Sequence, residues 1–464
     1  MTTRRDFVKT TGIAVSAVLA GAGTLEAAPG VAPSKPVTIA EVSSNFEREP
    51  LIRPFGFKGG YMTEIWQSAN FLKSSSGKHS IGLCTQNVLW SDAQVFAAHS
   101  ESGGNALMYA LTERALQIMK GQSFDTPVQL LDNILPEVYA FGQKITSNAG
   151  LRKTFALNAL VGADNAAWLL YAAENGYATF DEIIPAAYKP ALSRHHKQAA
   201  AIPLMAYNIP INEIQSAVEQ GYFFMKIKIG QPGTQEEMLE KDKARISAIH
   251  KAIGNVRTPH TKDGKLPYYF DANGRYEKKE TLLKLLDHAR NIGAFDQIAI
   301  IEEPFAEELE IDVTDIPVRL ASDESAHTDV DAIRRIQMGY KAIALKAIAK
   351  TLSMTMKIAQ VAYERNIPCF CADLTVNPIL VDWNKNVAAR LNSFPGLGSL
   401  GLVESNGHQN YKNWETMMGN HPRKDGAWIR QKNGVYELDD EFYKTSGGIF
   451  DPMPHYEEMF ASKK

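Results

Sequence analysis

From about residue 200 onwards, short apolar segments alternate with longer helical segments along the chain. The helical segments include 234–253, 276–291, 327–337 and 351–365. Strands joined in succession by crossover helices lie parallel, and eight of them close into a barrel. The alternation therefore predicts a parallel (β/α) barrel, with candidate strands at 202–207, 222–229, 267–271, 297–302, 318–322, 341–346, 367–372 and about 399–404.

The part of the chain before the barrel has a different order of elements. Three strand candidates at 37–48, 58–72 and 78–85 precede helical patterns at about 104–120, 126–146 and 155–175. Strands first and helices afterwards are typical of an α+β unit. A chain of 464 residues has room for both domains. We therefore predict an N-terminal signal at 1–28, an α+β domain at 29–195, a barrel at 196–405, and a tail at 406–464 that packs back on the first domain.

The N-terminus has the pattern of an export signal. Arg4 and Arg5 precede a short apolar run rich in Ala and Gly, which ends at small residues suited to cleavage. This pattern is typical of a twin-arginine signal peptide, so we expect a periplasmic protein that is exported folded. An uncleaved N-terminal anchor is the alternative. No later stretch has the length of a membrane span, so we expect no stable span after signal removal.

The net charge and the cysteine content disfavour certain partners and a disulfide-stabilised fold. The formal net charge of −3 includes no basic surplus, which disfavours nucleic acid and anionic membranes as partners. The cysteines Cys84, Cys369 and Cys371 are odd in number and form no spaced framework. Cys369 and Cys371 share one face of a candidate strand, a poor geometry for a disulfide. We expect the cysteines to pack in the core.

Two lysines occur together on the second candidate strand of the barrel. Lys226 and Lys228 alternate with isoleucines, so both lysines point to the same face of the strand. Two inward-facing lysines in a barrel are costly to bury without anionic partners. On a solvated edge of an open sheet they would need no such partners.

The next three candidate strands each end in a carboxylate. These residues are Asp271, Glu302 and Asp323, spaced 31 and 21 residues apart. In a parallel barrel the carboxyl ends of the strands meet at one mouth, where active sites are built. Three convergent carboxylates without histidine or cysteine suit a hard cation, Mg²⁺ above all. The alternative is that each carboxylate caps or charges the start of a helix.

A third lysine, Lys346, ends the sixth candidate strand, 23 residues beyond Asp323. The second and sixth strands are well separated in a ring of eight. Lys228 and Lys346 are therefore expected to approach a central ligand from opposite sides.

The motifs at these strand ends follow one another in the order and spacing of a known family. Together they resemble the enolase superfamily, and within it the mandelate racemase/muconate lactonizing enzymes, whose muconate-lactonizing subgroup includes dipeptide epimerases and N-acylamino acid racemases. The resemblance covers roughly 37–405. It implies an α/β fold, a modified (β/α)₇β TIM-type barrel with an N-terminal α+β capping domain, and a homo-oligomer. The motifs are Lys226-Ile227-Lys228, Asp271-Ala272-Asn273-Gly274, Ile301-Glu302-Glu303-Pro304, Asp323-Glu324-Ser325 and Leu345-Lys346.

The resemblance also implies a role for each of these residues. Asp271, Glu302 and Asp323 would hold one Mg²⁺ per active site, with Mn²⁺ as a possible substitute. Lys228 and Lys346 would be the paired acid/base groups. The remaining predicted contacts are to the substrate: Lys226, which would bind its carboxylate and lower the pKa of Lys228, together with Asn273, Glu404 and His408.

The expected reaction is removal of the proton next to the carboxylate of a small-molecule substrate, through an enolate. We expect a racemase or epimerase of an amino acid, a dipeptide or a related acid. The main alternative is a β-eliminating lyase, such as a dehydratase of a sugar acid or hydroxy acid. A cycloisomerase and a non-catalytic secreted binding protein are further alternatives.

The chain departs from the resembling family in three places. Residues 254–266 lengthen the connection before the third strand, and the tail after residue 406 is longer than usual. The eighth strand lacks the Asp-x-Asp pair of dipeptide epimerases and ends in a segment that contains Glu404 and His408. A satisfied core or surface histidine is the alternative for His408. Asp373, which ends the seventh strand, is either pocket lining or a loop cap.

Overall fold

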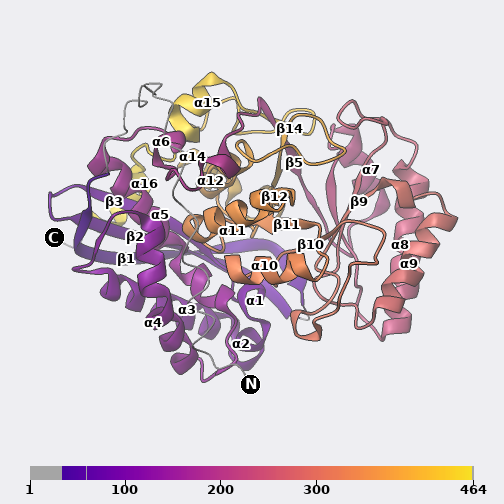
Figure 1. The fold of residues 1–464 in the computed structure, drawn as a ribbon, viewed down its shortest axis with the longest axis horizontal. Helices are drawn as coiled ribbons and strands as arrows, with labels where there is room; N and C mark the ends of the chain where they lie inside the picture. The colour runs from indigo at the N-terminus through magenta and orange to yellow at the C-terminus, as the bar shows by residue number, and fades with distance from the viewer. Residues whose placement is uncertain (1–33, 59, 462–464) are drawn as a thin grey trace, which may run out of the picture. The chain divides into compact units, whose positions relative to one another are not determined.

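The computed structural model describes residues 34–461, apart from residue 59. The predicted signal at 1–28 lies outside the described residues. Two separate sheets organise the described chain, one antiparallel and one predominantly parallel (Figure 1).

The antiparallel sheet belongs to the N-terminal domain. Its strands have the order β3-β2-β1-β4, and the long β1–β2 hairpin is interrupted by a register shift between Pro50 and Phe55. Long helices follow the first three strands, as the sequence predicts, and pack against the sheet. The elements are β1 (Val37–Phe57), β2 (Gly60–Ser74), β3 (His79–Gln86), α1 (Val88–Ser91), α2 (Ala93–Ala98), α3 (Glu101–Met119), β4 (Ser123–Phe124), α4 (Pro127–Ile145), α5 (Lys153–Asn175) and α6 (Phe180–Ile183).

The second sheet forms the barrel. Pro203 separates β5 from β6 in the chain; β5 pairs with β13 and β6 pairs with β7, so the ring of parallel strands closes at this residue. The strands are β5 (Gln198–Ile202), β6 (Leu204–Met205), β7 (Met225–Lys228), β8 (Tyr268–Asp271), β9 (Ile298–Glu302), β10 (Leu320–Ser322), β11 (Ala342–Leu345), β12 (Cys369–Cys371) and β13 (Gly401–Glu404).

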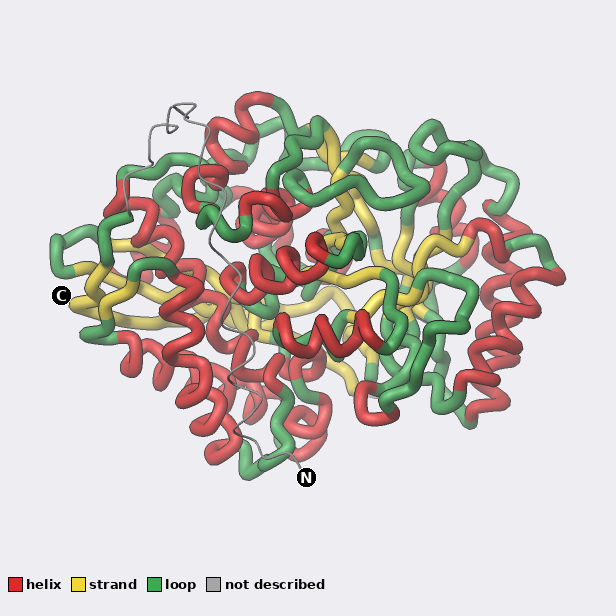
Figure 2. The backbone as a smooth tube through the Cα atoms, in the orientation of Figure 1, coloured by secondary structure: helices red, strands yellow, loops and turns green. Residues whose placement is uncertain are grey.

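Helices cover the outside of these strands, as the red and yellow tubes of Figure 2 show. The connection between β9 and β10 differs, because it contains only the short 3-10 turn Glu307–Leu309. The fold is therefore a modified (β/α) barrel with an N-terminal α+β capping domain. The crossover helices are α7 (Ile211–Glu219), α8 (Gln235–Ile253), α9 (Lys279–Asn291), α10 (Asp329–Gln337), α11 (Leu352–Glu364) and α12 (Pro378–Ala388).

The 254–266 insertion lies at the N-terminal mouth of the barrel, opposite the predicted site. Arg257 and Lys265 form an antiparallel bridge, and the insertion also bridges to the loop before β13. The carbonyl of His260 accepts a hydrogen bond from the Gly398 amide at 2.8 Å, and the His260 ring stacks on Phe223 at 4.1 Å. The insertion therefore packs against part of the bottom of the barrel, beside Phe223 and the loop before β13.

The C-terminal tail contacts both domains. Strand β14 (Val435–Glu437) pairs antiparallel with β5 of the barrel. Helix α16 (Pro454–Ala461) lies against the cap, where Asn45 donates to the Met459 carbonyl at 3.2 Å and His455 pairs with Glu47 at 2.7 Å.

A buried polar contact joins the cap to the barrel. Ser353 at the start of α11 donates its hydroxyl and its amide to the two oxygens of Asp164 on α5. Trp168 donates in turn to the Ser353 hydroxyl at 3.0 Å. Burial raises the pKa of Asp164 to about 7, although these donors oppose the shift.

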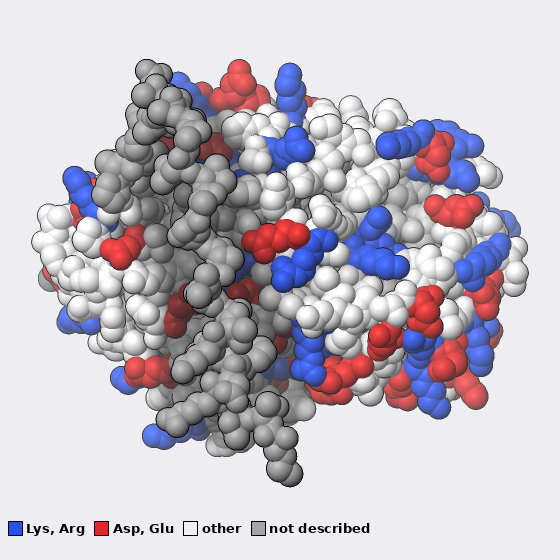
Figure 3. Space-filling model, in the orientation of Figure 1, with Lys and Arg blue, Asp and Glu red and all other residues white. Residues whose placement is uncertain are grey.

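The surface carries both signs of charge. On the face drawn in Figure 3, basic and acidic side chains are interspersed over the described residues. None of the helices between residues 34 and 461 is long and apolar enough to cross a bilayer. Cys84, Cys369 and Cys371 are free and buried.

Candidate active site

The polar strand ends of the barrel gather in one pocket with residues of the cap. The barrel contributes charged and amide side chains, whereas the cap contributes mainly aromatic ones. The pocket is lined by Phe55, Phe57, Asn87 and Trp90 from the cap, and by Leu204, Lys226, Lys228, Asn273, Asp323, Lys346, Asp373, Leu374, Thr375, Glu404 and Asn406 from the barrel.

Lys226 lies deep in this pocket, and carboxylates from three different strands hold it. Its Nζ lies 3.0 Å from Asp271, 3.1 Å from Glu302 and 3.2 Å from Glu404. Burial disfavours the ammonium, but the carboxylates outweigh burial and raise the pKa of Lys226 well above its usual value. The anionic partners that the sequence argument required are therefore present.

Lys228 lies on the same face of β7, two residues further on. Its Nζ donates to Asp271 at 2.5 Å and to the Asn273 side-chain oxygen at 2.6 Å. The chain then turns sharply at Gly230, whose φ of 78° is costly for other residues. Asp242 of α8 accepts the Gly230 amide at 2.7 Å and fixes this turn.

Lys346 directly follows β11, which lies across the ring from β7. Its Nζ lies 2.5 Å from Asp323 and 4.4 Å from the ring centroid of Trp90. Burial disfavours this ammonium, but the Asp323 carboxylate outweighs burial and raises the pKa of Lys346. This raised value depends on the ion pair, and would be lost with Asp323 engaged as a metal ligand.

The turn that carries Asp323 is held from beneath. Lys350 is fully buried and donates to the backbone carbonyls of Asp323 at 2.5 Å and of Ala326 at 3.0 Å. Glu303 accepts the Asp323 amide at 2.7 Å and the Ser325 hydroxyl at 3.0 Å. Glu303 therefore stabilises the turn, whereas its neighbour Glu302 pairs with Lys226 inside the barrel.

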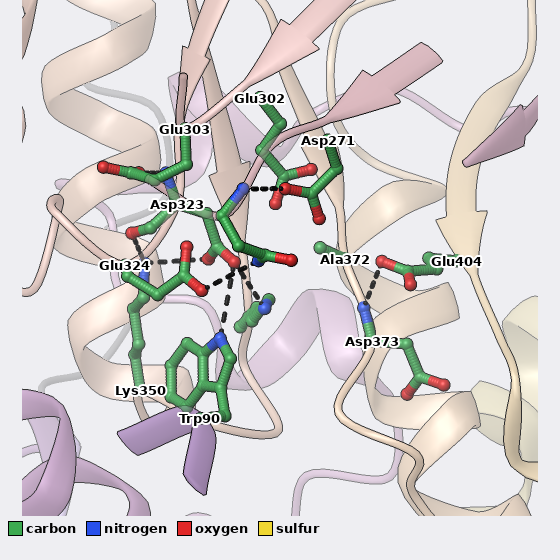
Figure 4. Close-up of polar contacts among 12 residues, drawn as sticks. Trp90, Asp271, Glu302, Glu303, Asp323, Glu324, Lys350, Ala372, Asp373 and Glu404 are labelled. Carbon is green, nitrogen blue, oxygen red and sulfur yellow. Dashed lines mark hydrogen bonds and ion pairs between the residues drawn. The ribbon is translucent and has the colours of Figure 1, made fainter. Parts of the chain in front are cut away.

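Several carboxylates converge at this mouth of the barrel (Figure 4). Oxygens of Glu302, Asp323 and Glu324 lie within 4.8 Å of one another. This cluster contains two members of the predicted metal triad and has Glu324 in place of Asp271. Asp271 lies beside Glu302 as its partner in the β8–β9 ladder, with its carboxylate paired to Lys226 and Lys228.

The oxygen atoms of the cluster fit a hard divalent cation. Asp323 Oδ1 and Glu324 Oε2 are buried and accept no hydrogen bond from the described residues. Burial and the nearby Asp271 carboxylate raise the pKa of Glu302 well above its usual value, despite the Lys226 ammonium. A bound divalent cation would satisfy these oxygens and favour the ionised form of Glu302.

The barrel is similar in sequence to a known protein family, and the fold is similar to solved structures. Residues 211–430 match the family model described as "Enolase C-terminal domain-like". This barrel belongs to the enolase superfamily. No curated protein sequence matches the chain.

Solved structures of the superfamily share the fold along most of the described chain. A mandelate racemase/muconate lactonizing protein from Herpetosiphon aurantiacus is 17% identical, with a TM-score of 0.60 over 88% of this chain and 97% of that one. A dipeptide epimerase from Enterococcus faecalis, complexed with Mg and L-Leu-L-Tyr, is 17% identical, with a TM-score of 0.60 over 87% and 97%. An N-succinyl Arg/Lys racemase from Bacillus cereus is 15% identical, with a TM-score of 0.58 over 81% and 89%.

The remaining predicted contacts fall in two different places of the enolase-superfamily barrel. Glu404 lines the pocket, where it pairs with Lys226 and accepts the Asp373 amide at 3.0 Å (Figure 4). Asp373 accepts the Asn406 amide at 2.7 Å, so it both lines the pocket and caps a loop. His408 lies apart from this group. It lines a separate cavity with Trp414 of the C-terminal tail and Lys385 of α12.

Sequence reasoning assigned no site role to several residues around the pocket. Glu324 pairs with Lys58 of the cap at 2.8 Å, and Trp90 of the cap reaches Asp323 and Lys346. Glu324 belongs to the Asp323-Glu324-Ser325 motif and could have been noted from the sequence. Lys58 and Trp90 belong to the cap and do not end a barrel strand, so no pattern in the sequence points to them. Ion pairs around the pocket connect five lysines and five carboxylates, namely Lys58, Lys226, Lys228, Lys346 and Lys350 with Asp271, Glu302, Asp323, Glu324 and Glu404.

Proposed function

We propose that the protein is a Mg²⁺-dependent racemase or epimerase that acts at the carbon next to a substrate carboxylate. One observation carries this proposal. Lys228 and Lys346 come from strands on opposite sides of the ring, and both line the pocket that contains the carboxylate cluster.

The chemistry follows from the weak acidity of the proton to be removed. Its loss leaves extra negative charge on the substrate carboxylate. Glu302, Asp323 and Asp271 would hold the divalent cation, which stabilises that charge when bound. Lys226, with its Nζ among Asp271, Glu302 and Glu404, is placed to neutralise the same carboxylate from the side of β7.

The two lysines account for inversion of the carbon. A base on one face removes the proton, and an acid on the other face returns one from the opposite side. With Lys228 and Lys346 exchanging these roles, both configurations become substrates. The aromatic cap side chains line the pocket and offer an apolar surface to the rest of the substrate.

The test is hydrogen exchange at the α-carbon in D₂O, followed by proton NMR with and without Mg²⁺. The probes are both configurations, at the C-terminal residue, of Leu-Tyr and Ala-Glu dipeptides, and both enantiomers of N-succinyl-arginine and N-succinyl-lysine. We expect metal-dependent deuterium uptake with inversion in one of these pairs.

Lys228→Ala and Lys346→Ala should each abolish exchange of one configuration, lowering its rate by about 10²-fold or more. Lys243→Ala, on the outer helix α8, is the matched control and should exchange at the wild-type rate. Release of water or another leaving group would point to elimination instead. Undiminished exchange in both pocket variants would refute the assigned roles.

A further inference from the structure

Residues of the cap contact the surroundings of both proposed acid/base lysines, each by a different route. Trp90, in the short helix α1, reaches the Lys346 side of the pocket. Lys58, at the end of the β1–β2 hairpin, reaches the Lys228 side through two intermediate residues. Both residues lie outside the barrel that supplies the lysines.

The contact of Trp90 involves both its ring and its nitrogen. The ring centroid lies 4.4 Å from Lys346 Nζ, within the range of a cation–π interaction. The indole N–H points to Asp323 Oδ2 at 3.5 Å, the same oxygen that binds Lys346 (Figure 4). Trp90 is buried, and its helix is capped by Asn87, which accepts the Trp90 amide at 3.0 Å. The buried indole ring is therefore held in place against the Lys346 ammonium.

The route from Lys58 is a chain of polar contacts. Lys58 Nζ lies 2.8 Å from Glu324 Oε1, which also accepts the Asn273 side-chain amide at 3.2 Å. With its nitrogen so engaged, Asn273 presents its oxygen to Lys228 Nζ at 2.6 Å. An amide has one acceptor oxygen and one donor nitrogen, so the Glu324 contact fixes which of the two faces Lys228.

We propose that the cap positions the two lysines through different side-chain contacts, with Trp90 holding Lys346 and Lys58 holding Lys228 through Glu324 and Asn273. Lys58 also donates to the Trp90 backbone carbonyl at 3.4 Å, a contact with the main chain rather than with the indole. This inference rests on the proposed function, because it assigns each cap residue to proton transfer on one face of the substrate. Trp90 and Lys58 are positioning residues, since they act through the lysines.

The physical reason concerns the partner that each lysine keeps during the reaction. Asp323 is both the ion-pair partner of Lys346 and a proposed metal ligand. A lysine that shares its carboxylate with a metal needs another contact to stay in place, and the Trp90 ring supplies one that carries no charge. Lys228 shares Asp271 in the same way, and the Asn273 oxygen supplies its second contact.

The experiment measures deuterium exchange at the α-carbon separately for each configuration, with the probe pairs and the Mg²⁺ conditions given above. Lys228→Ala and Lys346→Ala first identify which configuration depends on which lysine. Trp90→Leu should then lower exchange of the Lys346-dependent configuration by roughly tenfold and leave the other within about twofold. Trp90→Phe keeps a ring face and should retain most of the exchange.

Lys58→Met serves as the crossed control from the same domain. It should lower exchange only of the Lys228-dependent configuration, and Lys58→Arg should restore it. Thermal unfolding checks that each variant folds; if Trp90→Leu does not, Trp90→Met replaces it. Equal losses on both faces, no loss, or losses on the opposite faces would overturn the inference while leaving the proposed function in place. Absence of Mg²⁺-dependent exchange in the wild type would overturn both.

Discussion

At the scale of single residues, the site is a set of lysines and carboxylates that share partners. Asp323 accepts Lys346 and lies 3.5 Å from Lys350, while Asp271 accepts Lys226 and Lys228. A change to one of these carboxylates therefore removes a partner from at least one lysine ammonium. Substitutions that keep the shape of a carboxylate side chain but remove its charge distinguish effects on metal binding from effects on packing.

Asp271 and Glu324 compete for the third position of the metal triad, and two substitutions distinguish them. Asp271→Asn should lower Mg²⁺ affinity by more than about a hundredfold, because it removes a ligand charge. Glu324→Gln should lower it by no more than about tenfold, since the motifs of the enolase superfamily that the chain resembles assign the third ligand to Asp271. Isothermal titration with MgCl₂ measures both. The reverse order of effects would assign the third ligand to Glu324.

The barrel residues of the site could be predicted because strand position determines where they point. Lys226 and Lys228 alternate with isoleucines, and Asp271 and Glu302 end neighbouring strands, so their placement follows from the strand register. Trp90 could not be predicted in this way. It follows a strand of a different sheet, and its contact with Lys346 depends on how the cap docks.

At the scale of secondary-structure elements, alternation predicted the barrel strands from β6 to β13, whereas β5 and the local breaks needed the structure. The candidate strand at 202–207 is in fact centred earlier, and it is divided at Pro203, where a ladder donor is missing. The missing helix between β9 and β10 accords with the short spacing of Glu302 and Asp323. Apolar periodicity specifies neither a break of this kind nor the length of β1.

The Asp164–Ser353 contact between α5 and α11 should make stability depend on pH. The unfolded carboxyl titrates near pH 4 and the folded one at about 7, so the folded state binds the extra proton between these values. The stabilisation is full at low pH and is lost as the pH rises through 7. Its slope is at most about 1.4 kcal/mol per pH unit.

Asp164→Asn removes the titrating group and should flatten this dependence. The midpoint of thermal unfolding, compared between pH 5 and pH 8, should fall less in the variant than in the wild type. Parallel curves for the two proteins would show that Asp164 does not titrate in this range.

At the scale of the whole molecule, the two mouths of the barrel have separate tasks. The carboxyl ends of the strands carry the lysines and the carboxylates, whereas the insertion packs against the opposite end. In barrels of this kind, residues at the N-terminal mouth serve stability. The predicted barrel places the insertion at the N-terminal mouth, because it connects a helix to the strand β8. Its contact with the 397–398 loop could not be predicted, because that loop lies far from it in the sequence.

His260→Ala tests this separation of tasks. Loss of the stacking on Phe223 should lower the free energy of unfolding by about 1 kcal/mol. The kcat/KM for the best substrate pair should stay at the wild-type value. Thermal unfolding and steady-state kinetics on the same preparation provide the two measurements. A large fall in kcat/KM at unchanged stability would contradict the assignment.

The matched ion pairs around the pocket have a consequence for the order in which ligands associate. The formal charges of the five lysines and five carboxylates that these ion pairs join cancel. A divalent cation added to a neutral, buried set brings a surplus of two positive charges, which an organic anion would partly neutralise at low dielectric. Mg²⁺ and the substrate should therefore bind with positive cooperativity, each tightening the affinity for the other by the same factor.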